Sequence, residues 1–174
     1  MSLVENLSSF ARGFVNGFAQ EFSNPAVRAE PAYAPPRAAF QNLIRHLASE
    51  FDADVHWDED GEAAAALSVH VQGDDRLLCI VVREGTMYLS APSNIKFAPG
   101  CLPSGVAAFL AHRNRELDFA DWGEIDRNGK AYFTLKAHGH VDRINLDVLK
   151  AAIKKMLVEA LTLDVFLRKE GYVH

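Results

Sequence analysis

The segment from Arg76 to Arg83 constrains the fold most, because it places six consecutive apolar residues between two arginines. The run is short, is β-branched in its second half and lies between Gly73 and Gly85, which indicates a strand rather than a helix. Side chains alternate between the two faces of a strand. One face would carry Leu78, Ile80 and Val82, and the other Leu77, Cys79 and Val81. Because both faces are apolar, we expect a central strand in a sheet that is covered on both sides.

Composition excludes several classes of function. The 174 residues suffice for one domain with extensions, and the net charge of -5 with no basic cluster argues against a nucleic-acid partner. Two cysteines, Cys79 and Cys101, are too few for a disulfide framework, so we expect a cytoplasmic protein. No apolar run reaches the roughly 20 residues needed to span a bilayer, and the N-terminus lacks the pattern of a secretory signal.

Residues 1–22 are predicted to contain an amphipathic helix, from Leu3 to Phe22. Its apolar stripe includes Phe10, Phe14, Phe18 and Phe22, which recur at every fourth position. These rings could pack on the chain's own sheet or on a sister subunit, could dock on another protein, or could bind a membrane surface. Membrane binding is the weakest of these interpretations, because Arg12 is the only basic residue of the helix. We therefore predict that the four phenylalanines form part of a partner or dimer surface.

Residues 23–36 form a predicted linker, and residues 37–174 a single domain. The linker contains four prolines among alanines and should be extended and semi-rigid. In the domain, apolar periodicity predicts a helix at residues 37–51, a short extended piece at 52–57 and a three-strand meander at 67–91. A second helix at 105–114, a two-strand hairpin at 116–138 and a long helix at 146–169 follow. The predicted class is α+β, with helices packed on an antiparallel sheet.

The hairpin between Glu116 and His138 allows two registers around Asn128-Gly129. A two-residue turn would pair Ile125 with Tyr132 and would set Trp122 beside Leu135. A three-residue turn instead aligns Leu117, Phe119 and Ile125 with Ala131, Phe133 and Leu135. We expect the three-residue turn, because it keeps the apolar side chains on one face. It places Trp122, Tyr132 and Thr134 on the second face, where Trp122 and Tyr132 would join the partner or dimer surface.

The long helix from Leu146 to about Lys169 should begin after an Asn145 cap and end at Gly171. Its predicted buried stripe contains Leu149, Ala152, Ile153, Met156, Leu157, Ala160 and Leu161. We expect Lys150, Lys154, Lys155 and Glu159 to face water.

The best candidates for metal ligands are His138 and His140, whose imidazoles would share one side of a strand. Zinc needs a third or fourth ligand, and Asp142, His70 and Asp121 are not linked to this pair by any recognisable spacing. We expect solvated histidines and no metal or other cofactor. No nucleophile elbow, Walker loop or dinucleotide-binding glycine pattern occurs either.

The order of elements resembles the type III secretion chaperone-like superfamily, and within it the YbjN-like sensory-regulator branch. The most specific part is Leu110-Ala111-His112-Arg113-Asn114-Arg115-Glu116-Leu117-Asp118-Phe119, where the second helix leads into the fourth strand. The resemblance covers roughly residues 37–169. It implies an α+β domain that often dimerises, binds protein segments and has no catalytic residues.

We therefore expect a non-enzymatic protein-binding module, chaperone-like or regulatory, which forms a homodimer and binds an unidentified protein or peptide. A small-molecule or metal-binding domain is the alternative from another class. Peripheral membrane association through the N-terminal helix is a third interpretation.

Overall fold

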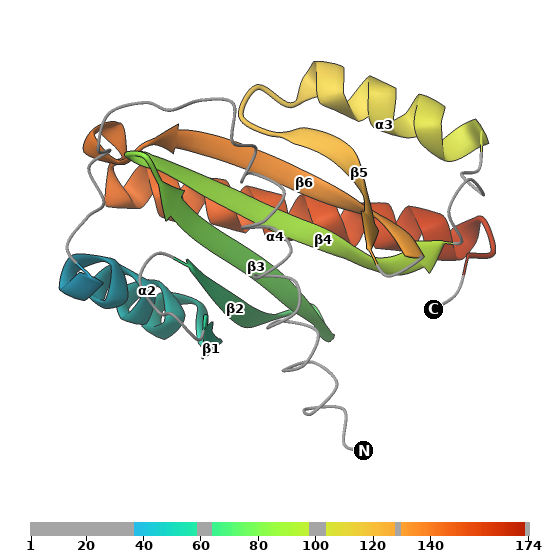
Figure 1. The fold of residues 1–174 in the computed structure, drawn as a ribbon. Helices are drawn as coiled ribbons and strands as arrows, with labels where there is room; N and C mark the ends of the chain where they lie inside the picture. The colour runs from blue at the N-terminus through green and yellow to red at the C-terminus, as the bar shows by residue number, and fades with distance from the viewer. Residues whose placement is uncertain (1–36, 59–63, 98–103, 128–129, 173–174) are drawn as a thin grey trace.

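The computed structural model describes residues 37–58, 64–97, 104–127 and 130–172 (Figure 1). The predicted N-terminal helix, the proline linker and the Asn128-Gly129 turn lie outside these residues. The helices are α2 (Arg37–Phe51), α3 (Ser104–Glu116), the short 3-10 helix η1 (Val141–Arg143) and α4 (Leu146–Lys169). The strands are β1 (Asp54–Trp57), β2 (Ala64–Val71), β3 (Asp74–Arg83), β4 (Thr86–Phe97), β5 (Asp121–Arg127) and β6 (Lys130–His140). The α+β class is confirmed.

The strands form one antiparallel six-stranded sheet in the order β1-β2-β3-β4-β6-β5. β3 lies between β2 and β4, so the apolar run that constrained the fold is an interior strand, as predicted. The short extended piece after α2 is β1, which pairs with β2 and adds an edge strand to the expected five. The two tight connections of the meander place Gln72, Gly73, Glu84 and Gly85 at positive φ. This left-handed geometry suits two-residue hairpin turns.

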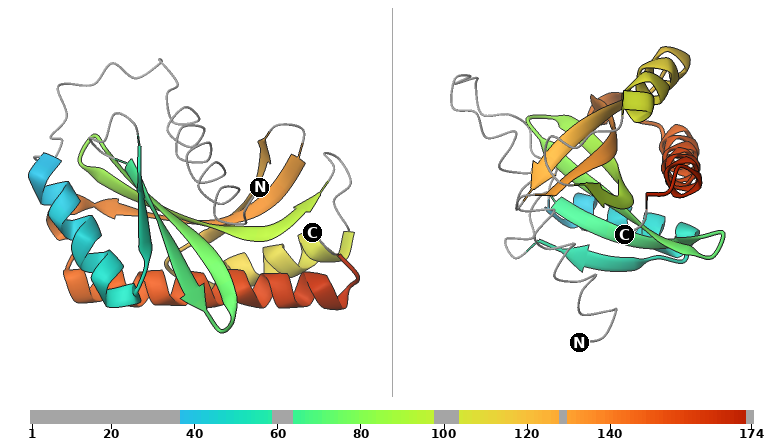
Figure 2. Two further views of the ribbon diagram at one scale, coloured as in Figure 1. Left: turned by 90° about the horizontal axis from the view of Figure 1, so that it is seen from below. Right: turned by 90° about the vertical axis from the view of Figure 1, so that its right-hand side faces the viewer.

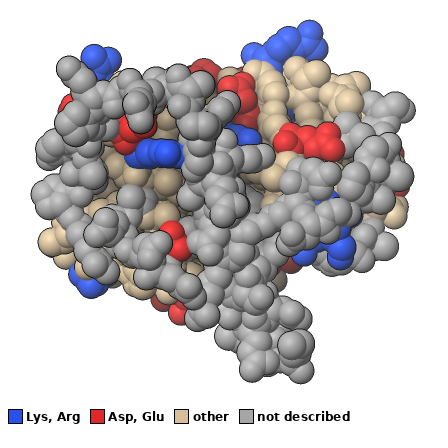
Figure 3. Space-filling view, viewed as in Figure 1, with Lys and Arg blue, Asp and Glu red and all other residues tan. Residues whose placement is uncertain are grey.

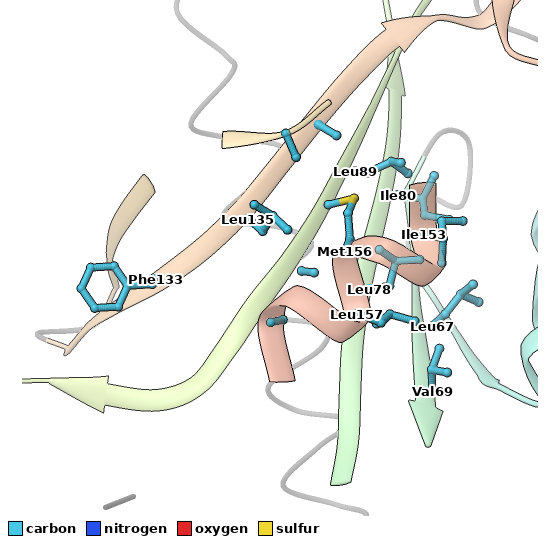
Figure 4. Packing of buried hydrophobic residues seen from close by; sticks show 14 of the residues in the cluster. Leu67, Val69, Leu78, Ile80, Leu89, Phe133, Leu135, Ile153, Met156 and Leu157 are labelled. Carbon is cyan, nitrogen blue, oxygen red and sulfur yellow. The ribbon is translucent and has the colours of Figure 1, made fainter. Parts of the chain in front are cut away.

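The described helices all lie on one face of the sheet (Figure 2). We call this the helix face, and the opposite one the second face. β3 directs Leu78 and Ile80 into the large core on the helix face, where they meet Ile153, Met156 and Leu157 of α4 (Figure 4). The alternate residues Leu77, Cys79 and Val81 belong to a separate cluster on the second face. The predicted two-sided character of this strand is confirmed.

The long helix α4 begins and ends as predicted. Asn145 accepts a hydrogen bond from the backbone N–H of Asp147 at 2.8 Å, and Gly171 has a φ of 88°. The apolar stripe is buried, apart from the half-buried Ala152. The expectation that Glu159 faces water is wrong, because it is 7% exposed and bonded to α3 and β5.

Strand β4 is longer than the sequence indicated. The predicted meander ends at residue 91, but β4 continues to Phe97 and Pro92 is buried. The pairing with β6 shifts register between Pro92 and Lys96, which is the irregularity expected of a β-bulge. A bulge accommodates a proline that cannot donate a hydrogen bond to the ladder.

The hairpin formed by β5 and β6 corrects the sequence prediction. Ile125 pairs with Tyr132 and Trp122 with Leu135, which is the register of the two-residue turn. The preference for the other register depended on Leu117 and Phe119 belonging to the strand. β5 begins only at Asp121, so neither residue constrains the pairing. Trp122 consequently lies on the helix face, whereas Tyr132 and Thr134 lie on the second face.

Candidate protein-binding surfaces

An apolar groove of about 490 Å³ lies between the first turns of α4, the C-terminal part of β6 and the segment that joins α3 to β5. Its floor and walls contain Met87, Leu89, Leu117, Phe119, Ala120, Ala137, Ile144, Val148, Leu149 and Ala152. All of these side chains are apolar, yet Val148 is 66% exposed. A smaller hollow of about 180 Å³ reaches toward α2 and shares Met87, Ile144 and Leu149 with the groove. Such a concave apolar surface is typical of a ligand or peptide site.

The outer edge of β6 is unpaired beside this groove. The pairing of β4 with β6 continues to Thr86 and His140, but that of β5 with β6 ends at Asp121 and Lys136. From Ala137 to His140, therefore, no strand of the described chain pairs with the β5 side of β6. An unpaired strand edge presents backbone donors and acceptors that an added strand can use.

The rim of the groove carries both signs of charge. Asp118 and Asp121 lie on the side of the connecting segment, and Arg143 lies just before α4. Lys136 and His138 also border the groove, but they alternate with the helix-face residues Leu135 and Ala137. The ring of His138 stacks on Tyr88 of the second face with a centroid distance of 6.2 Å. On the side of the molecule seen in Figure 3, acidic and basic side chains are likewise interspersed among the described residues. A rim of this kind offers hydrogen bonds to a peptide without selecting strongly for one sign of charge.

One wall of the groove is held by a polar cluster that joins α3, β5 and α4. Arg113 donates to both carboxylate oxygens of Glu159, at 2.8 and 2.5 Å, and Trp122 Nε1 donates to the same carboxylate at 3.3 Å. The hydrogen bonds from Arg113 to Glu159 are the main reason why the pKa of Arg113 is raised. Asn114 fixes β5 further, because its side chain bonds both backbone groups of Trp122. The cluster positions the segment from Leu117 to Ala120 over the groove.

A second polar cluster, centred on Asp164, connects α4 to the bulge of β4. Asp164 has no exposed surface and bonds Arg76 Nη1, Ser93 Oγ at 2.5 Å and the backbone N–H of Asn94 at 2.9 Å. Arg76 is also buried, at 1% exposure, and contacts Asp74 at 3.3 Å. A hydrogen bond from Arg168 is the main cause that lowers the pKa of Asp74. Both buried charges thus have partners, as the cost of an isolated buried charge requires.

The second face is the other apolar surface. Its cluster contains Ala64, Ala66, Leu77, Cys79, Val81, Ile125 and Tyr132, with Tyr88 at its margin, and all of them come from strands. Ser90 and Thr134 lie on the same face, with no exposed surface. Their hydroxyls have no hydrogen-bond partner among the described residues.

Removing an unpartnered hydroxyl should stabilise the protein. We expect Thr134→Val to raise the free energy of unfolding by about 1 kcal/mol, because it keeps the shape and removes a desolvated polar group. The melting temperature should rise by about 2–4 °C. The control is Thr162→Val, because Thr162 is exposed and its hydroxyl already bonds the carbonyl of Val158 at 2.9 Å. Equal melting shifts in the two variants would contradict this account of Thr134.

Of the residues predicted from sequence to form one surface, the two that the structure describes, Trp122 and Tyr132, lie on opposite faces of the sheet. Trp122 is 6% exposed in the core of the helix face, and Tyr132 is 2% exposed on the second face. Phe10, Phe14, Phe18 and Phe22 lie outside the described residues. The groove itself was missed. A usable signal was Val148, which interrupts the polar outer side of α4 close to the half-buried Leu117 and Phe119.

The candidate metal ligands were placed correctly on one strand, since both His138 and His140 are exposed on β6. Within the described part of the chain, no three His, Cys, Asp or Glu side chains converge on a position that could hold a metal ion. None of the helices in the same part is long and apolar enough to cross a membrane.

Comparison with known proteins identifies the fold. No protein-family model matches the chain, and no curated protein is detectably similar to it in sequence. Among solved structures, the chain shares its fold with a chain of the ExsC–ExsE complex, with YbjN and with a chain of a chaperone–effector complex, as the order of elements predicted.

Three of these structures illustrate the similarity. A chain of the ExsC–ExsE complex is 19% identical, with a TM-score of 0.55, over 75% of this chain and 95% of its own. YbjN from E. coli is 11% identical, with a TM-score of 0.56, over 82% of this chain and 98% of its own. A chain of the HopA1–SchA chaperone–effector complex is 8% identical, with a TM-score of 0.52, over 74% of this chain and 94% of its own. At these identities the similarity is one of fold.

Proposed function

We propose that this protein is a non-enzymatic, chaperone-like or regulatory module that binds an extended segment of another protein in the groove. The observation that carries the proposal is the position of the unpaired β6 edge beside the apolar groove. An added strand would gain backbone hydrogen bonds from residues 137–140, while alternate side chains would enter the groove.

Two of the structural neighbours support this proposal. The ExsC–ExsE and HopA1–SchA structures are both complexes of two proteins, and the second is described as a chaperone with its effector. The mixed charge of the groove rim and the net charge of -5 favour a protein partner over a nucleic acid.

The proposal can be tested with Val148→Asp. Peptides of about 12 residues would first be selected from a random display library on the full-length protein, and their affinities measured by calorimetry. We expect Val148→Asp to weaken binding at least tenfold, or about 1.4 kcal/mol, because a carboxylate would be desolvated in the apolar groove. Val148 is 66% exposed, so the substitution should leave the fold intact.

The matched control is Val165→Asp. Val165 is on the same helix and is 40% exposed, but it does not line the groove. It should retain the affinity of the parent protein. Selected peptides that bind both variants as tightly as the parent would refute the assignment of the groove.

A homodimer remains a prediction. It rests on the resemblance to a superfamily whose members often dimerise and on the two-sided apolar strand, whose second face either a sister subunit or the N-terminal helix could cover. We expect light scattering of the full chain at micromolar concentration to give about twice the protomer mass of 19.2 kDa. A mass of one protomer would contradict the dimer and would leave the groove proposal unaffected.

A further inference from the structure

The second face has the character of a surface that is covered. Its clustered apolar side chains are 7% exposed or less, although the described part of the chain places no helix there (Figure 2). Antiparallel sheets that leave one face in water normally carry polar residues on that face. An apolar sheet face of this extent requires an occupant, because it would otherwise promote association.

We propose that the occupant is the N-terminal segment Leu3–Phe22 of the same chain, packed on the second face through its phenylalanines. The shapes are complementary. Small side chains form the middle of the face, namely Ala64, Ala66, Cys79, Ser90 and Thr134. A helix with a phenylalanine at every fourth position presents a ridge of large rings, which fits over such a shallow bed.

The length of the chain before the first described residue suits this placement. The described chain begins with α2, which packs at the β1 side of the sheet. About 14 linker residues can extend about 43 Å in a polyproline-like conformation. The six-stranded sheet is about 24 Å wide between its outer strands, and a 20-residue helix is about 30 Å long. The segment can therefore reach the second face and cross most of it.

Two further observations favour this segment over a second copy of the chain. Between Leu3 and Phe22 only Glu5, Arg12 and Glu21 are charged. Packing this segment on an apolar face would therefore remove few charges from water. A short linker also holds the segment at an effective concentration in the millimolar range, above the micromolar concentration of a second copy in solution. This placement does not depend on the groove, which lies on the helix face.

Cys79 provides a reporter of the cover. It has no exposed surface, and its neighbours across β3 on the second face are the small residues Ala66 and Ser90. Uncovering the face would therefore expose the thiol. In a full-length chain carrying Cys101→Ser, we expect Phe14→Asp with Phe18→Asp to accelerate alkylation of Cys79 by N-ethylmaleimide at least tenfold. The control adds the same charge with Asn16→Asp and Gln20→Asp, and should react within twofold of the parent.

Circular dichroism of each variant would show whether the sheet remains folded. An unchanged alkylation rate in the folded phenylalanine variant would overturn the proposal. If the phenylalanine variant unfolds, a second measurement tests the proposal. It introduces one cysteine at a time in the same Cys101→Ser background, as Phe10→Cys, Phe14→Cys, Phe18→Cys or Phe22→Cys. At least one introduced thiol should form a disulfide with Cys79 on mild oxidation.

The mass of the oxidised product distinguishes the occupants. A disulfide at the mass of one protomer supports packing within the chain. A disulfide-linked dimer would overturn it and assign the second face to a sister subunit. The absence of a link at all four positions would overturn it as well, and would leave the phenylalanines for another protein or a membrane surface. Asn16→Cys is the control that should not form the link.

Discussion

Replacing Asp164 by alanine should lower the free energy of unfolding by about 3–5 kcal/mol, because the variant leaves Arg76 with an incompletely paired buried charge. The carboxylate also bonds Ser93 and the backbone of Asn94, so its loss would release the bulge of β4 from α4. Denaturant unfolding of the parent and the variant measures the difference. The control is Asp74→Ala, whose contacts with Arg76 and Arg168 lie nearer the surface. It should cost no more than about 1 kcal/mol.

Replacing both charged partners should cost less than replacing one. The double variant Arg76→Met with Asp164→Leu removes both buried charges together, and such replacements are often neutral or even stabilising. We expect it to be more stable than Asp164→Ala. Equal losses in the single and double variants would mean that packing, rather than the charge left on Arg76, dominates the cost.

Replacing Trp122 by alanine should lower the free energy of unfolding by about 3–5 kcal/mol, the range for large-to-small changes of a buried tryptophan. Trp122 is 6% exposed in the core of the helix face, and its indole N–H bonds Glu159. A tryptophan that belonged to an open partner surface, as the sequence suggested, would affect binding more than unfolding. Chemical unfolding followed by circular dichroism separates these outcomes.

The other tryptophan of the chain, Trp57, is the control. It lies on the edge strand β1, half-buried, with the guanidinium of Arg45 6.0 Å from the ring centroid. Trp57→Ala should therefore be less destabilising than Trp122→Ala. A small loss for Trp122→Ala, together with a large one for Trp57→Ala, would contradict the register of β5 and β6.

The elements that the sequence predicted best have strong local periodicity. The unbroken apolar run that contains Leu78 and Ile80 predicted an interior strand, and the stripe from Leu149 to Leu161 predicted a long helix. Both were confirmed, because side-chain direction in a strand or a helix follows from backbone geometry alone. The caps of α4 were equally local, since Asn145 and Gly171 act within one turn of the helix.

The errors arose where distant elements decide the outcome. The pairing of β5 depended on where the strand begins, and bonds from Asn114 of α3 hold Trp122 near that start. Glu159 looks like a solvated residue on its helix, but it is buried because Arg113 and Trp122 approach from two other elements. The groove was not predicted, because its shape depends both on where the pairing of β5 with β6 ends and on the position of α4.

The sequence by itself determined the order of the elements, the central position of β3 and the apolar character of both sheet faces, because these depend on the spacing of apolar residues along the chain. Only the tertiary structure decided which polar residues are buried and which apolar residues line an open groove. The carboxylate of Asp164 occupies a position on the buried side of α4, and its spacing alone does not show that Arg76 neutralises it 88 positions earlier. A buried charge is stable only with such a partner, and that partner is supplied by packing rather than by local sequence.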